Sequence, residues 1–317
     1  MPSGSIGSIT AVIGNIAINS TTGISARDGI ATIGAAAIEA AVTANANGDG
    51  DLHRLVTVSD FTGTISARDL DDPDGAQGCT GISIGGAFDG IMAFDRDVRL
   101  SISMETMTPG SQIVVHGNVL SQYPDEPCAT TQVIQARSGA ITSIRVDGDF
   151  GNGNEWFEVL AGTTIGQISV GGVYGRPGNA ELLARIEAPG GINSVSGNVV
   201  IARIQGPGGS SAAYLNTLET TLHFVGAVTV DSVDRIDIGS DMIAVVTLAD
   251  GLGVNDTIRV GGKKCGARRR PHPRGPPSPS STLSSFCPTW ASTGRSSSTR
   301  AARRTPTLTC TGRALSA

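Results

Sequence analysis

The stretch that decides the fold is ITSIRVDGD at residues 141–149. β-Branched apolar residues occupy its first, fourth and sixth positions, small or polar residues stand between them, and a glycine follows. This alternation predicts a short strand with one face buried, and β-branched residues suit such a pleated, half-buried surface. The glycine lets the chain turn at positive φ and lets neighbouring turns pack closely.

The same unit recurs along the chain, as IGQISVGG at 165–172, VDRIDIGSD at 233–241 and IRVGG at 258–262. Successive copies are 22 or 24 residues apart, or separated by three steps of about 23. A constant period in this range is typical of a solenoid, in which one coil cannot bury its apolar face alone and neighbours must stack on it. We therefore predict one all-β parallel solenoid over residues 1–262, with coils of about 22–24 residues.

Other architectures fit less well. Residues 32–43 could form a short helix, or a coil with small inward side chains. Elsewhere the 43 glycines argue against helices, because each costs about 1 kcal/mol relative to alanine in a helix. A β-sandwich would need two-residue hairpin turns between alternating strands, and a constant repeat length favours the solenoid instead. No apolar run approaches the roughly 20 residues that a membrane-spanning helix needs.

The repeated Ile-x-x-Ile-x-Val-x-Gly unit resembles the coils of right-handed parallel β-helix proteins, particularly the glycine-rich repeat proteins of bacterial cell surfaces. The resemblance covers roughly residues 1–262. It implies a right-handed parallel β-helix and a bacterial protein that is secreted or held at the cell surface. Because lyases, adhesins and passenger domains share such coils, the resemblance specifies a fold and leaves the function open.

The charges divide the chain into two unlike parts. Residues 1–262 hold all 28 acidic residues with twelve arginines and no lysine, a net charge of −16 that disfavours nucleic acid as a partner. Residues 263–317 hold eleven basic residues and no acidic one, in a Ser/Arg/Thr/Pro-rich composition. Such a composition cannot bury enough apolar surface to order the chain, so we expect a disordered tail. The abrupt change after Gly262 suggests a product of out-of-frame translation.

The residues that could carry chemistry form an incomplete set. The motifs of pectin-degrading β-helix hydrolases are mostly missing, and the histidines of residues 1–262, His53, His116 and His223, are far apart in sequence. We therefore assign no catalytic residue and expect a non-enzymatic structural or adhesive solenoid that contacts carbohydrate or cell-envelope components. The alternative is a secreted polysaccharide lyase or hydrolase that uses Arg68, Asp69, Asp71 and Asp72. A third interpretation is a cytosolic assembly scaffold.

One segment is a candidate calcium loop. Asn45, Asn47, Asp49 and Asp51 place oxygen ligands at alternate positions, as in the first half of an EF-hand or dockerin loop, with Gly50 where such loops turn. The twelfth position holds Val56 instead of a bidentate carboxylate. Calcium is the only cofactor that this pattern suggests, and an Asx-rich turn explains the same residues.

Cys79 and Cys128 lie in Pro/Gly/Asp-rich segments 49 residues apart, about two coils. They are either a disulfide of an exported protein or two free thiols. The first residues contain no signal peptide, and the repeat is interrupted at both ends, so we expect a truncated chain. Terminal coils of a parallel solenoid expose unpaired backbone groups, which predicts end-to-end self-association.

Overall fold

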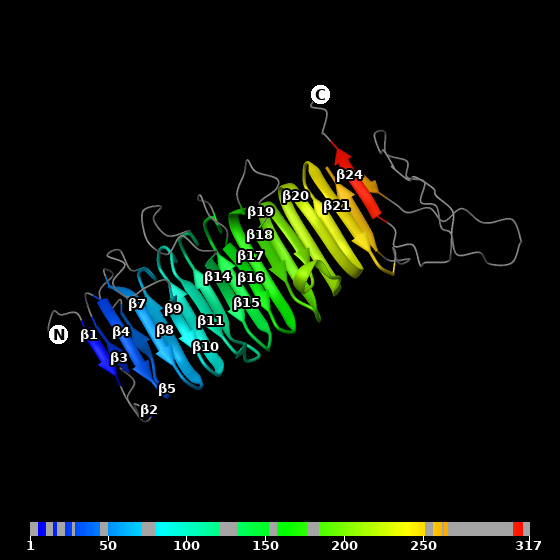
Figure 1. The fold of residues 1–317 in the computed structure, drawn as a ribbon. Coiled ribbons are helices and arrows are strands. Elements are labelled where there is room, and N and C mark those ends of the chain that lie inside the picture. The colour runs from blue at the N-terminus through cyan, green and yellow to red at the C-terminus, as the bar shows by residue number, and fades with distance from the viewer. Residues whose placement is uncertain are drawn as a thin grey trace, which may run out of the picture.

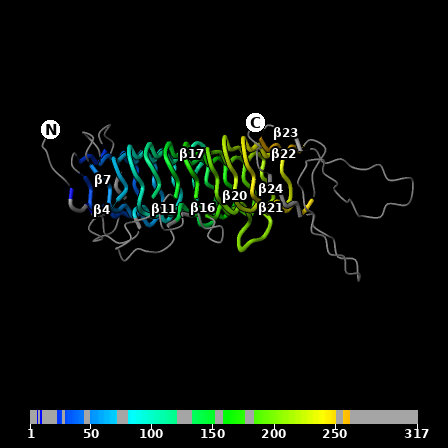
Figure 2. The backbone as a smooth tube through the Cα atoms, turned by 90° about the horizontal axis from the view of Figure 1, so that it is seen from above, coloured from blue at the N-terminus to red at the C-terminus, as the bar shows by residue number. Residues whose placement is uncertain are grey.

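The computed structural model describes residues 6–10, 15–17, 23–26, 29–44, 50–71, 80–120, 132–151, 157–175, 184–250, 256–261, 263–265 and 307–312. These residues form a rod of short strands (Figure 1), and a view turned by 90° shows the coils stacked along its axis (Figure 2). The pairings along the solenoid, from β1 to β22, are all parallel. The predicted parallel β-solenoid is therefore confirmed.

Each coil has three sides. The first side consists of β1 (Ile6–Thr10), β4 (Gly29–Ala35), β7 (Asp51–Thr57), β9 (Thr80–Ile84), β11 (Ser101–Met104), β14 (Gln132–Ala136), β16 (Phe157–Ala161), β18 (Ala184–Glu187) and β21 (Met242–Leu248). The second side consists of β2 (Asn15–Ala17), β3 (Ile24–Ser25), β5 (Ala37–Glu39), β6 (Val42–Thr43), β8 (Phe61–Ala67), β10 (Ala87–Phe94), β12 (Thr106–Met107), β13 (Gln112–Val115), β15 (Ile141–Val146), β17 (Thr164–Tyr174) and β22 (Thr257–Val260). The long strands β19 (Gly191–Gln205) and β20 (Ala212–Ile238) bend through more than one side. Among the described residues the one helical element is a short 3₁₀ turn, η1 (Pro207–Gly209).

Inward-facing residues stack in register into several apolar columns, and on each side of the coil one column runs along most of the rod. On the first side the parallel pairings join Ile9, Ile33, Leu55, Ile82, Ile102, Ile134, Val159, Ile186, Ile204, Val228 and Val246. On the second side they join Ile24, Val42, Ile65, Met92, Ile113, Ile144, Ile168, Val195 and Leu218. On the third side they join Leu52, Leu70, Val98, Val119, Phe150, Tyr174, Val200, Phe224 and Met242.

These columns and the buried residues aligned beside them form one core. The apolar positions of the unit at 141–149, Ile141, Ile144 and Val146, are all buried, as the repeat predicted. Each fully buried aliphatic or aromatic side chain contributes about 1.5–3 kcal/mol relative to an exposed one. Since one coil supplies only a few such side chains, the stacking of many coils is what makes the fold stable.

The coils vary in length around the predicted 22–24 residues. Steps along the first column range from 18 residues, between Ile186 and Ile204, to 32 residues, between Ile102 and Ile134. The longest step includes residues 121–131, outside the described residues. A column residue therefore returns to the same place in each coil, while the connection between the sides differs in length.

Glycine matters most where two coils approach closely. Gly90 has φ +153°, and a Cβ atom at this position would lie 1.7 Å from the carbonyl oxygen of Gly63 in the preceding coil. Gly63 has φ +139°, and a Cβ atom there would likewise lie too close to the carbonyl oxygen of Ala40 in the coil before it. Both glycines lie inside strands of the second side, so their role is close stacking of coils as well as turning.

The segment that could have formed a helix forms strands instead. Residues 29–43 form β4, β5 and β6 rather than a helix, and Ile33 and Ile38 point inward.

Two short segments of the tail are described, β23 (Lys263–Cys265) and β24 (Thr307–Gly312). They pair antiparallel with β22 and β21, which composition did not predict, so β24 occupies an edge of β21 that was expected to be open. The described residues contain no helix long and apolar enough to cross a membrane.

Candidate functional site: a polar network on the third side

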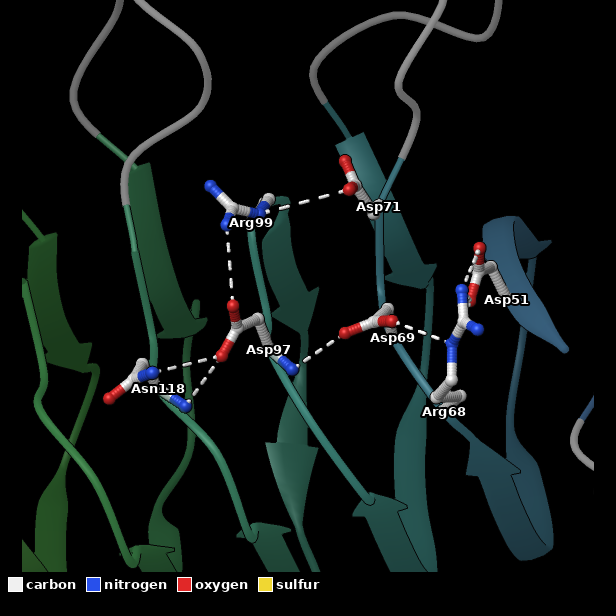
Figure 3. A network of polar contacts seen from close by, with 7 residues as sticks. All are labelled: Asp51, Arg68, Asp69, Asp71, Asp97, Arg99 and Asn118. Atoms are coloured by element: carbon white, nitrogen blue, oxygen red, sulfur yellow. Dashed lines mark hydrogen bonds and ion pairs between the residues drawn. The ribbon is translucent and has the colours of Figure 1, made fainter. Parts of the chain in front are cut away.

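Charged and polar side chains gather at the third side of the coils, from β7 to the segment that follows β13. In the sequence, each of these residues is an immediate neighbour of a third-column residue, except Arg68, which lies two residues before Leu70. The register of the solenoid therefore aligns side chains from four successive coils. Figure 3 shows them: Asp51, Arg68, Asp69, Asp71, Asp97, Arg99 and Asn118.

Arg68 lies between two carboxylates. Its Nε donates hydrogen bonds to Asp51 Oδ1 at 3.1 Å and to Asp69 Oδ2 at 2.9 Å, and its Nη2 donates to Asp51 Oδ2 at 3.2 Å. Burial raises the pKa of the Asp51 carboxyl above its ordinary value, although the Arg68 guanidinium opposes the shift. Arg68 thus neutralises carboxylates from two successive coils (Figure 3).

Arg99 repeats this arrangement one coil further on. Its Nη2 lies 3.3 Å from Asp97 Oδ2, and its Nε lies 3.8 Å from Asp71 Oδ2 in the preceding coil. The three side chains are largely shielded from solvent, with exposed fractions of 14% to 24%. Partial burial strengthens such pairs relative to those on an open surface.

A second set of contacts runs along the rod from backbone to side chain. The N–H of Asp97 donates to Asp69 Oδ1 at 2.7 Å, and the N–H of Asn118 donates to Asp97 Oδ1 at 2.9 Å. The N–H of Asp149 then donates to Asn118 Oδ1 at 2.9 Å, and the N–H of Val173 donates to Asp149 Oδ1 at 2.8 Å. We call Asp69, Asp97, Asn118 and Asp149 the polar ladder. Each member satisfies a backbone donor of the next coil at the equivalent position.

This geometry favours a structural role for the residues of the enzymatic alternative. The structure does bring Arg68, Asp69 and Asp71 to one side, while Asp72 lies outside the described residues. A lyase of this fold would need a basic group directed at substrate and carboxylates grouped around a cation. Here Arg68 is bonded to Asp51 and Asp69, and no group of three or more His, Cys, Asp or Glu residues in the described chain is placed to hold a metal.

The candidate calcium loop is described only at its end. Asn45, Asn47 and Asp49 lie outside the described residues, and Asp51 opens β7 with its carboxylate bonded to Arg68. The candidate disulfide cysteines, Cys79 and Cys128, also lie outside the described residues.

The histidines belong to separate places on the rod. His116 Nδ1 lies 2.8 Å from Asp147 Oδ2 in the next coil, and His223 Nδ1 lies 3.5 Å from Asp241 Oδ2. The His116 hydrogen bond, together with a smaller contribution from Arg145, lowers the pKa of the Asp147 carboxyl. The His116 and His223 pairs each join successive coils, as the arginines do.

A buried polar cluster on the outer face of the first side was not anticipated. Glu158 is nearly inaccessible to solvent and receives two hydrogen bonds from Arg185, the one from Nη2 at 2.5 Å. Arg185 Nη1 also lies 3.5 Å from Glu187 Oε1, which accepts a hydrogen bond from Gln205 at 2.8 Å. The sequence signal was the echo of 185–187, Arg-Ile-Glu, in 203–205, Arg-Ile-Gln, which the structure pairs strand to strand.

Comparison with protein-family models, with curated proteins and with solved structures finds no match for this chain. The stacked parallel solenoid is thus established by the strand pairing itself.

Proposed function

We propose that the chain is a non-enzymatic structural and adhesive solenoid that acts outside the cell or at its surface. The observation that carries the proposal is the engagement of Arg68 and Arg99. Both lie between carboxylates of successive coils, and the neighbouring carboxylates accept backbone hydrogen bonds. An enzyme with this fold would direct such arginine and carboxylate side chains at its substrate, whereas here they join one coil to the next.

The outer face of the second side supports carbohydrate as the partner. From β15 to β20 the register aligns Ser143, Gln167, Ser194 and Thr217 in one outward row. Hydroxyl and amide groups both donate and accept hydrogen bonds, as sugar hydroxyls do. Neighbouring strands lie about 4.8 Å apart, so the row presents such groups at regular intervals along the rod.

Cosedimentation of the full chain with insoluble polysaccharides and with bacterial envelope preparations tests this proposal. We expect retention on at least one matrix, and reduced retention when Gln167→Glu and Ser194→Glu place charge in the row. Ser83→Glu with Ser103→Glu, which changes a paired row on the first side, is the matched control. Retention on no matrix by a chain with an intact β-sheet circular dichroism spectrum would overturn the proposal.

The enzymatic alternative keeps one observation in its favour, the gathering of Arg68, Asp69 and Asp71 on a single side (Figure 3). It requires turnover of a polysaccharide that depends on these residues and on Asp72. The cytosolic scaffold remains a third candidate, which reduced Cys79 and Cys128 in native material would favour and a disulfide between them would exclude.

Calcium binding by Asn45, Asn47, Asp49 and Asp51 is a separate proposal. Titration calorimetry with calcium chloride measures it directly. Heat that Asp49→Ala abolishes would establish the site, and the absence of heat would leave these residues as a turn.

A further inference from the structure

The third side is built in two different ways along the rod. In four coils the second-side strand ends before the third side: β8 ends at Ala67, β10 at Phe94, β13 at Val115 and β15 at Val146. Their third-column residues, Leu70, Val98, Val119 and Phe150, are joined only by isolated bridges. From β17 onward the strand includes the third-column residue, because β17 runs on to Tyr174 and β19 and β20 continue through Val200 and Phe224.

The polar ladder occupies the first of these regions and ends where the second begins. Its members Asp69, Asp97, Asn118 and Asp149 each stand directly before a bridge residue. The equivalent positions in the next two coils are Val173 and Val199, which carry no side-chain acceptor. The last ladder bond runs from the N–H of Val173 to Asp149. In the two coils that follow Val199 the equivalent positions hold His223 and Asp241, whose side chains pair with each other, Nδ1 to Oδ2 at 3.5 Å. The ladder bonds from side chain to backbone N–H lie where the strands are interrupted, whereas this later contact joins two side chains.

We infer that the solenoid consists of two cooperative segments that meet at Tyr174. In the first, residues 50–173, the third side is held closed by the polar ladder and its ion pairs. In the second segment, residues 174–248, the third side is held closed by continuous backbone pairing. The third side of the first segment is the part of the rod that opens without unfolding the rest, since stacked coils contact only their neighbours and open in local units.

Asp97 is the residue on which this arrangement depends most. Its own N–H is bound by Asp69, its Oδ1 accepts from the N–H and the side-chain amide of Asn118, and its Oδ2 pairs with Arg99. Replacement by alanine removes the acceptor for the next coil and leaves Arg99 with Asp71 alone among these carboxylates. Replacement by asparagine keeps an acceptor oxygen and removes only the charge.

Hydrogen exchange of the full chain, followed by mass spectrometry, tests the inference. For Asp97→Ala we expect at least tenfold faster exchange in peptides that contain 95–100 and 117–120, and unchanged exchange in peptides from 224–230 and 242–248. Asp97→Asn should exchange within threefold of the unmodified chain at all of these peptides. Asp237→Ala, which removes the ion pairs with Arg235 and with Arg259 of the next coil in the outer face of the second side, is the matched control and should leave 95–120 unchanged.

Three results would overturn the inference. Asp97→Ala without faster exchange at 95–100 would show that the ladder does not hold the side closed. Equal acceleration in both segments would show one cooperative unit. An Asp97→Asn variant as fast as Asp97→Ala would show that the acceptor bonds of the ladder do not hold the side closed. If Asp97→Ala does not fold, Asn118→Ala removes the next acceptor and is measured at 117–120 and 147–151 with the same expectations.

Discussion

The aromatic rings of Phe150 and Tyr174 stack inside the rod, with centroids 4.8 Å apart and planes inclined by 20°. The two residues form the last isolated bridge of the third side and are fully buried. They join the region of interrupted strands to the region of continuous ones. The Tyr174 hydroxyl is buried with no hydrogen-bond partner within the described chain, and burial raises its pKa far above the ordinary value, with a smaller contribution from Glu158.

Removal of that hydroxyl should therefore stabilise the protein. We expect Tyr174→Phe to raise the free energy of unfolding by about 1 kcal/mol, because a buried, unsatisfied polar group costs about 1–3 kcal/mol. Tyr174→Ala should lower it by about 3–5 kcal/mol through loss of the ring and the cavity left behind. Urea denaturation measures both, with the exposed Val58→Ala as a neutral control. A destabilised Tyr174→Phe variant would mean that the hydroxyl has a partner.

Gly90 should not tolerate a side chain. Its backbone conformation alone costs a residue with Cβ about 1–3 kcal/mol, and the added atom would contact the Gly63 carbonyl in the neighbouring coil. We expect Gly90→Ala to lower the free energy of unfolding by at least about 3 kcal/mol. Gly110→Ala separates the two causes, since Gly110 also has positive φ but open space around it. Equal losses in the two variants would contradict the close approach of coils.

Arg185→Met should destabilise the fold, because it leaves the buried carboxylate of Glu158 without its ion-pair partner. Without Arg185, Glu158 keeps its burial but loses two charge-assisted hydrogen bonds, and an unpaired buried acceptor costs about 1–3 kcal/mol or more. The matched control is Arg145→Met, whose partner Asp147 is far more exposed and whose loss should cost less than about 1 kcal/mol. Similar losses from both variants in thermal denaturation would contradict the burial of Glu158.

The Asp147 carboxyl should titrate below its ordinary value of 3.8. Because its folded pKa is lowered, the group stabilises the fold above the unfolded value, and this contribution is lost as pH falls through the folded pKa. Carboxyl-carbon NMR titration measures it residue by residue. His116→Ala should raise the Asp147 pKa toward 3.8, because the His116 hydrogen bond is the main cause of the shift. An unchanged Asp147 titration in that variant would contradict the contact.

Much of the fold could be predicted from the repeat because its period is directly visible. Ile141, Ile144 and Val146 stand at the alternating positions of a half-buried strand, and every described copy of the unit places such residues in a column. The third side was harder to predict from the sequence. Its members are single residues such as Leu70 and Val98, each flanked by charged residues, so they show no alternation that marks a strand.

Only part of the polar network could be predicted from the sequence. Arg68, Asp69 and Asp71 drew attention as a charged cluster, but their partners Asp51, Asp97 and Arg99 lie 17 to 28 residues away in sequence. Only the register between coils brings them together, and an irregular coil length conceals that register. The pairing of Glu158 with Arg185 was hidden for the same reason, 27 residues apart.

We propose that the charged residues of the third side hold coils together and do not turn over substrate. Assay of the full chain on a panel of acidic and neutral polysaccharides, read as new reducing ends and as unsaturated products, tests it most directly. We expect neither product on any substrate, and we expect Arg68→Ala and Asp71→Ala to lower only the unfolding temperature. Turnover that Arg68→Ala or Asp71→Ala abolishes, in a variant whose circular dichroism spectrum is unchanged, would contradict it.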